Sequence, residues 1–187
     1  MAEIWDGLWD LAVDQYGYVT SRDATALGLA DTTLGKMAAR GRLERVAYGL
    51  YRFPQWPISA NDNLMQAVLW ARDPLAVLSH ETALAVWELC DVNPSKTHVT
   101  IPKRRPLRRA FVPPTYEIHR EDLAAADRGW WQQIPTVTPA TAIRQGIVQG
   151  LRPSLITQAI DQALDRNLMD DVTAAKRMSE LDGRFRS

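Results

Sequence analysis

The order of short, sharply delimited segments between residues 3 and 53 constrains the fold of this chain more than any other feature. Apolar residues recur at helical spacing over residues 3–14 and predict an amphipathic first helix. Thr20 and Asp23 have the spacing of a capping box, which predicts the start of a short second helix. Gly28 ends that helix, because glycine readily takes the left-handed conformation that closes a helix.

A third helix and a hairpin follow at once. Asp31-Thr32-Thr33 supplies another N-cap, and Gly41 ends the helix that begins there. From Leu43 to Phe53 apolar and polar residues alternate around Tyr48-Gly49, which predicts a short hairpin with an unusual backbone geometry at the glycine. Helix, short helix, turn, helix and hairpin is the order of a winged helix-turn-helix.

The segment Pro54-Gln55-Trp56-Pro57 is the best domain boundary, because two prolines in four residues suit neither a helix nor a central strand. We therefore predict an α+β protein. Its N-terminal winged helix-turn-helix, residues 1–55, is followed by a C-terminal mixed α/β domain, residues 59–187, that ends in helices.

Caps and periodicity divide the second domain into helices and strands. Predicted strands cover residues 76–78, 97–101 and 116–120, the last two alternating like paired strands. Predicted helices cover residues 61–72, the segment after the capping Ser79, the segments opened by Thr138-Pro139 and Arg152-Pro153, and residues 171–182.

The formal net charge is zero, which by itself does not suggest a nucleic-acid ligand, but the charges are segregated along the chain. Residues 3–31 carry six acidic side chains against Arg22. Residues 32–53 carry five bases, Lys36, Arg40, Arg42, Arg45 and Arg52, against Glu44. The third helix and the hairpin are therefore the positive part of the N-terminal domain.

This positive part predicts a DNA-binding surface. Thr32, Thr33 and Lys36 lie on the exposed side of the first turns of the third helix, where side chains reach base edges in the major groove. We expect the remaining residues to hold the phosphate backbone: Arg40, Arg42, Arg45, Tyr48 and Arg52. The alternative is that Thr32 only caps the helix and that the arginines form a solvated face.

Two segments of the second domain are possible contacts for a macromolecule. The basic block, which we define as residues 103–109, contains five bases and no acid, and we predict that it contacts DNA or an acidic toxin surface unless it is only a solvated loop: Lys103, Arg104, Arg105, Arg108 and Arg109. Trp130-Trp131 follows Gly129 in a loop-like stretch, so the pair is either a contact for a protein partner or part of the core.

In this order the residues resemble the AbiEi antitoxins of bacterial type IV toxin-antitoxin systems. The N-terminal half carries the resemblance on Thr20-Ser21, Ala24, Gly28-Leu29, Leu34, Gly41, Leu43, Arg45-Val46, Gly49, Tyr51 and Pro54. The second half carries it on Leu78-Ser79-His80, Ala83-Leu84, Leu89, Val99-Thr100-Ile101-Pro102, Arg104-Arg105, His119 and Ile134-Pro135-Thr136-Val137-Thr138-Pro139. After Thr141 the chain departs from the family, with Ile143-Arg144-Gln145-Gly146 in place of an apolar, Asp-containing helix.

The resemblance implies a winged-helix repressor that binds operator DNA and controls its own operon. It also implies a second domain that neutralises a nucleotidyltransferase-like toxin, either by binding the toxin or by opposing its effect without contact. Two alternatives stay open: a winged-helix transcription factor that senses a small ligand, and a nuclease-related enzyme. The nuclease is the weaker one, because no Glu-x-Lys pair that would support metal-assisted phosphate cleavage occurs in the sequence.

The sequence gives little support for a metal, cofactor or catalytic site. The three histidines and the single cysteine, Cys90, lack the close spacings of zinc ligands, so the sequence predicts no metal site. No phosphate-binding glycine loop occurs, and we predict no cofactor and no enzymatic activity. The single cysteine, the lack of an export signal and the lack of a long apolar run predict a cytoplasmic protein without a membrane partner.

Overall fold

The structure is a computed structural model that describes residues 2–30, 32–104, 106–107, 109 and 111–185. The chain forms two compact units, Met1–Trp70 and Ala71–Ser187. The predicted domain boundary at residues 54–57 therefore lies inside the first unit, and the segment up to Trp70 belongs with the N-terminal elements. Each unit is described by itself below.

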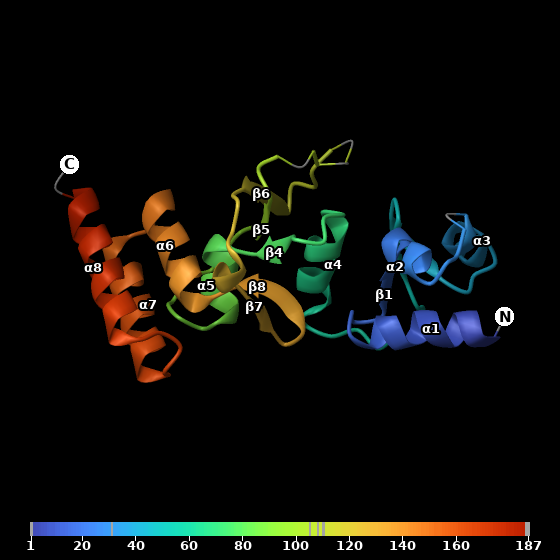
Figure 1. Ribbon diagram of the computed structural model, residues 1–187, viewed down its shortest axis with the longest axis horizontal. Coiled ribbons are helices and arrows are strands. Elements are labelled where there is room, and N and C mark those ends of the chain that lie inside the picture. Colours follow the sequence, from blue (N-terminus) through green and yellow to red (C-terminus); the bar gives the residue numbers. More distant parts are fainter. Residues whose placement is uncertain (1, 31, 105, 108, 110, 186–187) are drawn as a thin grey trace. The chain divides into compact units, whose positions relative to one another are not determined.

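The first unit has the predicted order of helices and hairpin (Figure 1). Its elements are α1 (Ala2–Val13), β1 (Tyr18–Thr20), α2 (Ser21–Ala26), α3 (Thr33–Ala39), β2 (Glu44–Ala47), β3 (Leu50–Arg52) and α4 (Asp62–Trp70). Strand β1 was not predicted, and it pairs antiparallel with β3, so that the sheet of the described residues has the order β1-β3-β2. The extra strand completes the small antiparallel sheet of a winged helix.

Local hydrogen bonds explain where these elements begin. The Thr20 backbone amide donates to Asp23 Oδ2 (2.7 Å), and the Asp23 amide donates to Thr20 Oγ1 (3.2 Å), so the predicted capping box is confirmed. Gly49 has a φ of +70° at the turn between β2 and β3, as predicted. The carbonyl of Gly49 accepts a hydrogen bond from the Ser21 amide (3.0 Å), which ties the turn of the hairpin to the first residue of α2.

A small apolar core holds the three N-terminal helices against the sheet. Leu8, Leu34 and Phe53 are fully buried in it. Trp5 and Trp9 of α1 contact the Phe53 ring edge-on, with ring centroids 4.8 and 5.0 Å away. The apolar stripe of the first helix is therefore a core stripe.

Polar contacts connect α4 to this sheet. Arg52, the last residue of β3, forms a salt bridge of 2.7 Å with Asp62, the first residue of α4. Asp62 also accepts hydrogen bonds from the amide and the hydroxyl of Ser59, which fixes the start of the helix. The Tyr18 hydroxyl donates to Gln66 Oε1 (3.1 Å) one turn further along. These contacts explain why the first unit extends to Trp70.

The second unit combines a mixed sheet with helices. Its elements are β4 (Val77–Leu78), α5 (His80–Val86), β5 (Thr97–Ile101), β6 (Tyr116–Arg120), the 3-10 turn η1 (Ala125–Asp127), β7 (Arg128–Trp131), β8 (Ile134–Val137), α6 (Pro139–Gln149), α7 (Pro153–Asp165) and α8 (Asp171–Phe185). The strand order is β6-β5-β4-β8-β7 within the described residues. Strands β5 and β6 pair in parallel, as do β4 and β8, whereas β4–β5 and β7–β8 are antiparallel. The predicted α+β class is thus confirmed.

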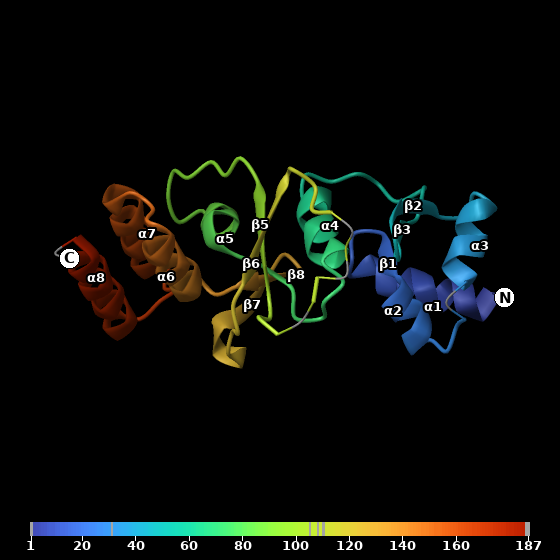
Figure 2. The ribbon, with the colours of Figure 1, turned by 90° about the horizontal axis from the view of Figure 1, so that it is seen from above.

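Helices α6, α7 and α8 lie side by side beyond the sheet (Figures 1 and 2), and α5 packs against α6. Their shared core includes Leu84 of α5, Ile143 of α6 and Ile156 and Ile160 of α7. Prolines at the first positions of α6 and α7 open these helices as predicted. In the part of the chain that the structure describes, no helix is long and apolar enough to cross a bilayer.

Candidate nucleic-acid interface

Helix α3 presents a polar face to solvent and an apolar face to the core. Leu34 is fully buried, whereas Thr32 and Lys36 are exposed and Thr33 is half-buried. Thr32 has helical backbone angles, and its hydroxyl makes no capping hydrogen bond to α3. The alternative in which Thr32 only caps the helix is therefore not what the structure has, and both Thr32 and Lys36 are exposed. The third residue of the predicted cap, Asp31, lies outside the described residues.

Two arginines follow the C-terminal end of α3. Arg40 is exposed at the C-cap position. Arg42 is exposed as well, and its guanidinium carbon lies 4.2 Å from the centroid of the Trp5 ring, a cation–π contact that orients the side chain. An arginine stacked on a ring keeps its donors at the edge available for phosphate oxygens.

The hairpin of β2 and β3 carries the remaining exposed residues of the predicted surface. Arg45 is exposed on β2, and Tyr48 is 65% exposed at the turn. The Arg45 guanidinium carbon lies 5.8 Å from the centroid of the Tyr48 ring. A cation and a phenol are thus presented together on the wing, in the position from which winged helices contact the backbone.

Arg52 was predicted from the sequence to contact the DNA backbone, and the structure places it differently. The group of bases on the third helix and hairpin predicted a phosphate contact here. The residue is only 8% exposed, however, and its guanidinium binds Asp62. All three residues of β3 are buried, and Arg52 at its end meets the first residue of α4. Arg52 is a structural residue, and the predicted DNA contact at this position is wrong.

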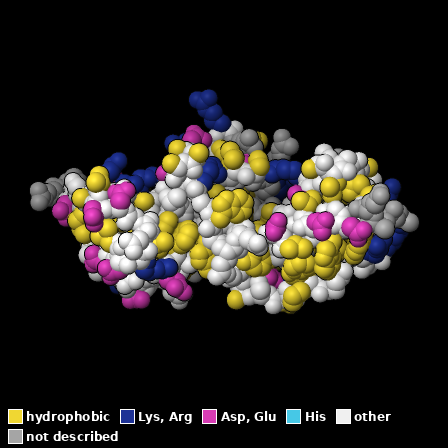
Figure 3. Space-filling model, turned by 60° about the horizontal axis from the view of Figure 1, so that its bottom comes forward, with side chains coloured by type: hydrophobic (Ala, Val, Ile, Leu, Met, Phe, Trp, Pro, Cys, Tyr) yellow, Lys and Arg dark blue, Asp and Glu magenta, His cyan; other side chains and the backbone are white. Residues whose placement is uncertain are grey.

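Three exposed acidic side chains of the unit lie on or beside α1, whereas the hairpin carries one, Glu44. Asp6 and Asp10 are exposed on α1 and Asp14 is exposed in the turn directly after it, at a spacing of four residues. Figure 3 shows acidic groups in a row along this side of the first unit. Because phosphates repel this row, DNA would approach the α3 and wing side.

The basic block lies in the connection between β5 and β6. Lys103 and Arg104 are exposed there. Arg109 is half-buried, and burial together with the nearby Arg72 lowers the pKa of its guanidinium to about 10. Arg105 and Arg108 lie outside the described residues. The first two bases are thus the described members best placed to meet a ligand, and the role of the block stays a prediction.

The tryptophan pair belongs to a strand, and its assignment to a loop is wrong. Trp130 and Trp131 end β7, which forms a hairpin with β8 through Gln132 and Gln133, both with positive φ. Trp130 is 69% exposed and Trp131 is half-buried. The turn lacks glycine and asparagine, the residues that usually mark such geometry, so it could not be recognised from local composition. Since β7 is an edge strand, Trp130 is open to a partner.

The three histidines, separated in sequence, lie together in the second unit. Side-chain ligand atoms of His80, His98 and His119 are all within 4.8 Å of one another. The spacing argument against a metal site missed this group, because its members meet only through the pairing of strands. Cys90, the single cysteine of the chain, is not part of this group.

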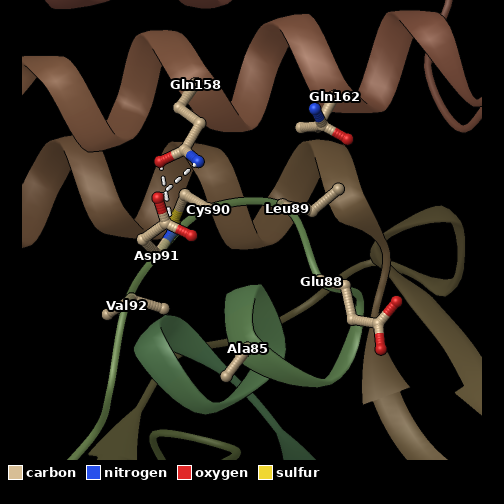
Figure 4. A pocket seen from close by; sticks show the side chains of 8 residues that line it. All are labelled: Ala85, Glu88, Leu89, Cys90, Asp91, Val92, Gln158 and Gln162. Atoms are coloured by element: carbon tan, nitrogen blue, oxygen red, sulfur yellow. Dashed lines mark hydrogen bonds between the residues drawn. The ribbon is translucent and has the colours of Figure 1, made fainter.

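Cys90 lines an open pocket of about 450 Å³ between the end of α5 and helix α7 (Figure 4). The Gln158 side chain spans one side of it, accepting from the Asp91 amide (3.1 Å) and donating to Asp91 Oδ2 (2.9 Å). This pocket is one place that a small effector could use if the ligand-sensing alternative held.

Comparison with known proteins adds two findings. No curated protein gives a significant match to the sequence. Among solved structures, the Rv2827c protein of Mycobacterium tuberculosis is similar with a TM-score of 0.51 and 19% identity, over 95% of this chain and 75% of that one. At this identity the likeness shows a shared fold.

Residues 9–54 match the family model described as "Transcriptional regulator, AbiEi antitoxin". The match spans α2, α3 and the wing, where the N-terminal half of the sequence carries its resemblance. It ends before the second unit, so the resemblance of that unit stays a prediction. Residues 9–54 are therefore similar to the N-terminal domain of AbiEi antitoxin transcriptional regulators.

Proposed function

We propose that the chain is an antitoxin that binds operator DNA, represses its own operon and neutralises a nucleotidyltransferase-like toxin encoded beside it. The observation that carries the proposal is the surface formed by α3 and the wing, which gathers exposed hydroxyls and cations on the domain matched by the regulator family. Thr32, Thr33 and Lys36 read base edges, while Arg40, Arg42, Arg45 and Tyr48 hold phosphates. The chain acts by binding and not by catalysis.

A gel-shift assay on the DNA upstream of the gene tests the repressor role. The double variant Lys36→Ala/Arg45→Ala removes one groove contact and one wing contact, both from exposed positions. We expect weaker operator binding and a salt dependence that is shallower by about 0.9 in log K against log salt for each lost phosphate contact.

The matched control is Arg152→Ala/Lys176→Ala, which removes the same charge from exposed positions of the second unit. It should leave operator affinity and its salt dependence unchanged. Equal effects of the two double variants would mean that binding follows net charge alone, and no effect of the first would exclude the α3 and wing surface.

The toxin-neutralising role belongs to the second unit in this proposal. Trp130, exposed on an edge strand, and the cations Lys103 and Arg104 offer the kinds of side chain that anchor and orient a protein partner. Co-expression with the neighbouring gene should rescue growth. Co-purification of the two proteins would indicate direct binding, rescue without co-purification would indicate indirect antagonism, and a non-toxic neighbour would refute the antitoxin role.

A further inference from the structure

The histidine cluster, which we define as His80, His98 and His119, contains every histidine of the chain. His98 Nδ1 lies 2.9 Å from His119 Nε2. The His80 ring stacks on the His119 ring with centroids 3.6 Å apart, and the His98 and His119 rings are nearly parallel at 5.1 Å. Three imidazoles therefore share one small volume.

Strand pairing creates the cluster. In the parallel register of β5 and β6, Thr100 lies opposite His119 and Glu117 lies opposite His98. His98 and Thr100 point to the same face of β5, and their register partners point to that face too. His80 follows β4, the other neighbour of β5, and the Ser79 amide donates to the His98 carbonyl (3.1 Å). Three separate elements thus each contribute one ring.

Burial favours the neutral form of all three imidazoles. Burial is the largest cause that lowers the pKa of His80, to about 3, with further lowering by the charges of His119, His98 and Arg144. Burial also lowers the pKa of His98 and of His119. Neutral imidazole has a free lone pair and is the form that binds a metal ion.

Polar residues around His80 hold it in place. Ser79 Oγ lies 3.0 Å from His80 Nδ1. Gln145 Oε1 accepts from the His80 amide (3.0 Å), and Gln145 Nε2 donates to Glu121 (2.7 Å), which also binds Arg144. Hydrogen bonds of this kind to a ligand's second nitrogen and to its supporting residues are typical of metal sites.

Two further features suggest a site and not ordinary packing. His80 has a φ of +52°, a conformation that non-glycine residues rarely adopt and that is often retained at functional positions. Thr100, opposite His119, is fully buried, and its hydroxyl has no hydrogen-bond partner among the described residues. A buried polar group without a partner is costly unless a ligand or water completes it.

We propose that His80, His98 and His119 bind a divalent transition-metal ion of the imidazole-preferring class, of which zinc is the type. Three histidine ligands leave one coordination position for water or a fourth group. Because the ligands come from α5, β5 and β6, a bound ion would link these elements and stabilise the second unit. The proposal is independent of DNA binding by the first unit.

The test uses the full chain without an affinity tag, since added histidines would bind metal themselves. Isothermal titration with Zn²⁺ at pH 7.5 should give one site per chain, and Co²⁺ should give the visible bands of a tetrahedral complex. His98→Ala and His119→Ala should each weaken zinc binding at least a hundredfold. Cys90→Ser, which removes the chain's single thiol, should bind zinc as the unaltered chain does.

Absence of zinc binding to the unaltered chain, or binding that persists in His98→Ala/His119→Ala, would overturn the proposal. Because an alanine variant can fail to fold, a second measurement uses the unaltered chain only. Zinc should shift the imidazole nitrogen resonances of all three histidines together in NMR spectra. Shifts confined to one histidine, or to none, would equally refute a shared site.

Discussion

The guanidinium of Arg52 and the carboxylate of Asp62 form a salt bridge of 2.7 Å in which both side chains are about nine-tenths buried. The pair joins the last residue of the central strand to the first residue of α4. Because of this pair, the segment after the wing is not a simple linker but part of the first unit.

Removing one partner of this pair should destabilise the first unit. Asp62→Ala leaves a buried, uncompensated guanidinium, and we expect the free energy of unfolding to fall by about 3–5 kcal/mol. Arg52→Met/Asp62→Leu should recover most of that loss, because it removes both charges. Urea unfolding measures the two effects. Arg45→Ala, at an exposed position, is the control and should change stability by less than about 0.5 kcal/mol. A loss in the control as large as that of Asp62→Ala would contradict the structural role of the Arg52–Asp62 pair.

Alanine substitutions at Gly17 and Gly28 separate the cost of backbone strain from the cost of a steric clash. Both have positive φ, but a Cβ at Gly17 would lie 2.3 Å from Trp56 Cγ, whereas a Cβ at Gly28 meets no described atom within 4 Å. Gly28→Ala should cost about 1 kcal/mol from backbone strain alone. Gly17→Ala should cost about 1–3 kcal/mol more, because Trp56 must move. Equal losses on thermal unfolding would show that Trp56 does not pack there.

Thr100 and Thr136 are both fully buried but differ in hydrogen bonding. The Thr136 hydroxyl donates to the Ile134 carbonyl (2.9 Å), whereas the Thr100 hydroxyl has no partner among the described residues. In metal-free protein, Thr100→Val should stabilise by about 1 kcal/mol and Thr136→Val should destabilise by about as much. Chemical denaturation compares them, and the reverse order would mean that the Thr100 hydroxyl is satisfied.

The Cys90 thiol should react slowly with alkylating reagents. Burial raises its pKa to about 11, with smaller contributions from the charges of Asp91 and Glu81. At pH 8 the thiolate is therefore about a hundredfold rarer than for a thiol of ordinary pKa near 9. The greater nucleophilicity of a more basic thiolate offsets part of this, so we expect reaction roughly tenfold slower than for a small thiol. The rate should keep rising up to about pH 11, and a plateau near pH 9 would contradict the raised pKa.

Local signals in the sequence were sufficient for most of the helices and for the wing. The capping box at Thr20, the glycine at position 49 and the prolines that open α6 and α7 act through the nearest residues, so they can be recognised in one stretch of chain. Strand β1 was not predicted, because it is only three residues long and lies between the signals of two helices.

The error at Arg52 and the omission of the histidine cluster share a physical cause, which is dependence on residues distant in the sequence. The partner of Arg52 lies ten positions away on α4, beyond the segment that alternation describes. The histidine cluster depends on the parallel pairing of β5 with β6, and no spacing within the sequence reveals that register. Exposure of the α3 residues followed from periodicity, whereas their contact with DNA still rests on the proposal.

The hydrogen bond from the Ser21 amide to the Gly49 carbonyl has a consequence for the entropy of binding. A loop that is loose in the free protein loses conformational freedom when it meets its ligand, and this loss weakens affinity. Here the turn of the wing is anchored to α2 when the domain folds, so its ordering precedes any encounter with DNA. The contacts of Arg45 and Tyr48 would then contribute to affinity with little entropic penalty from the wing backbone.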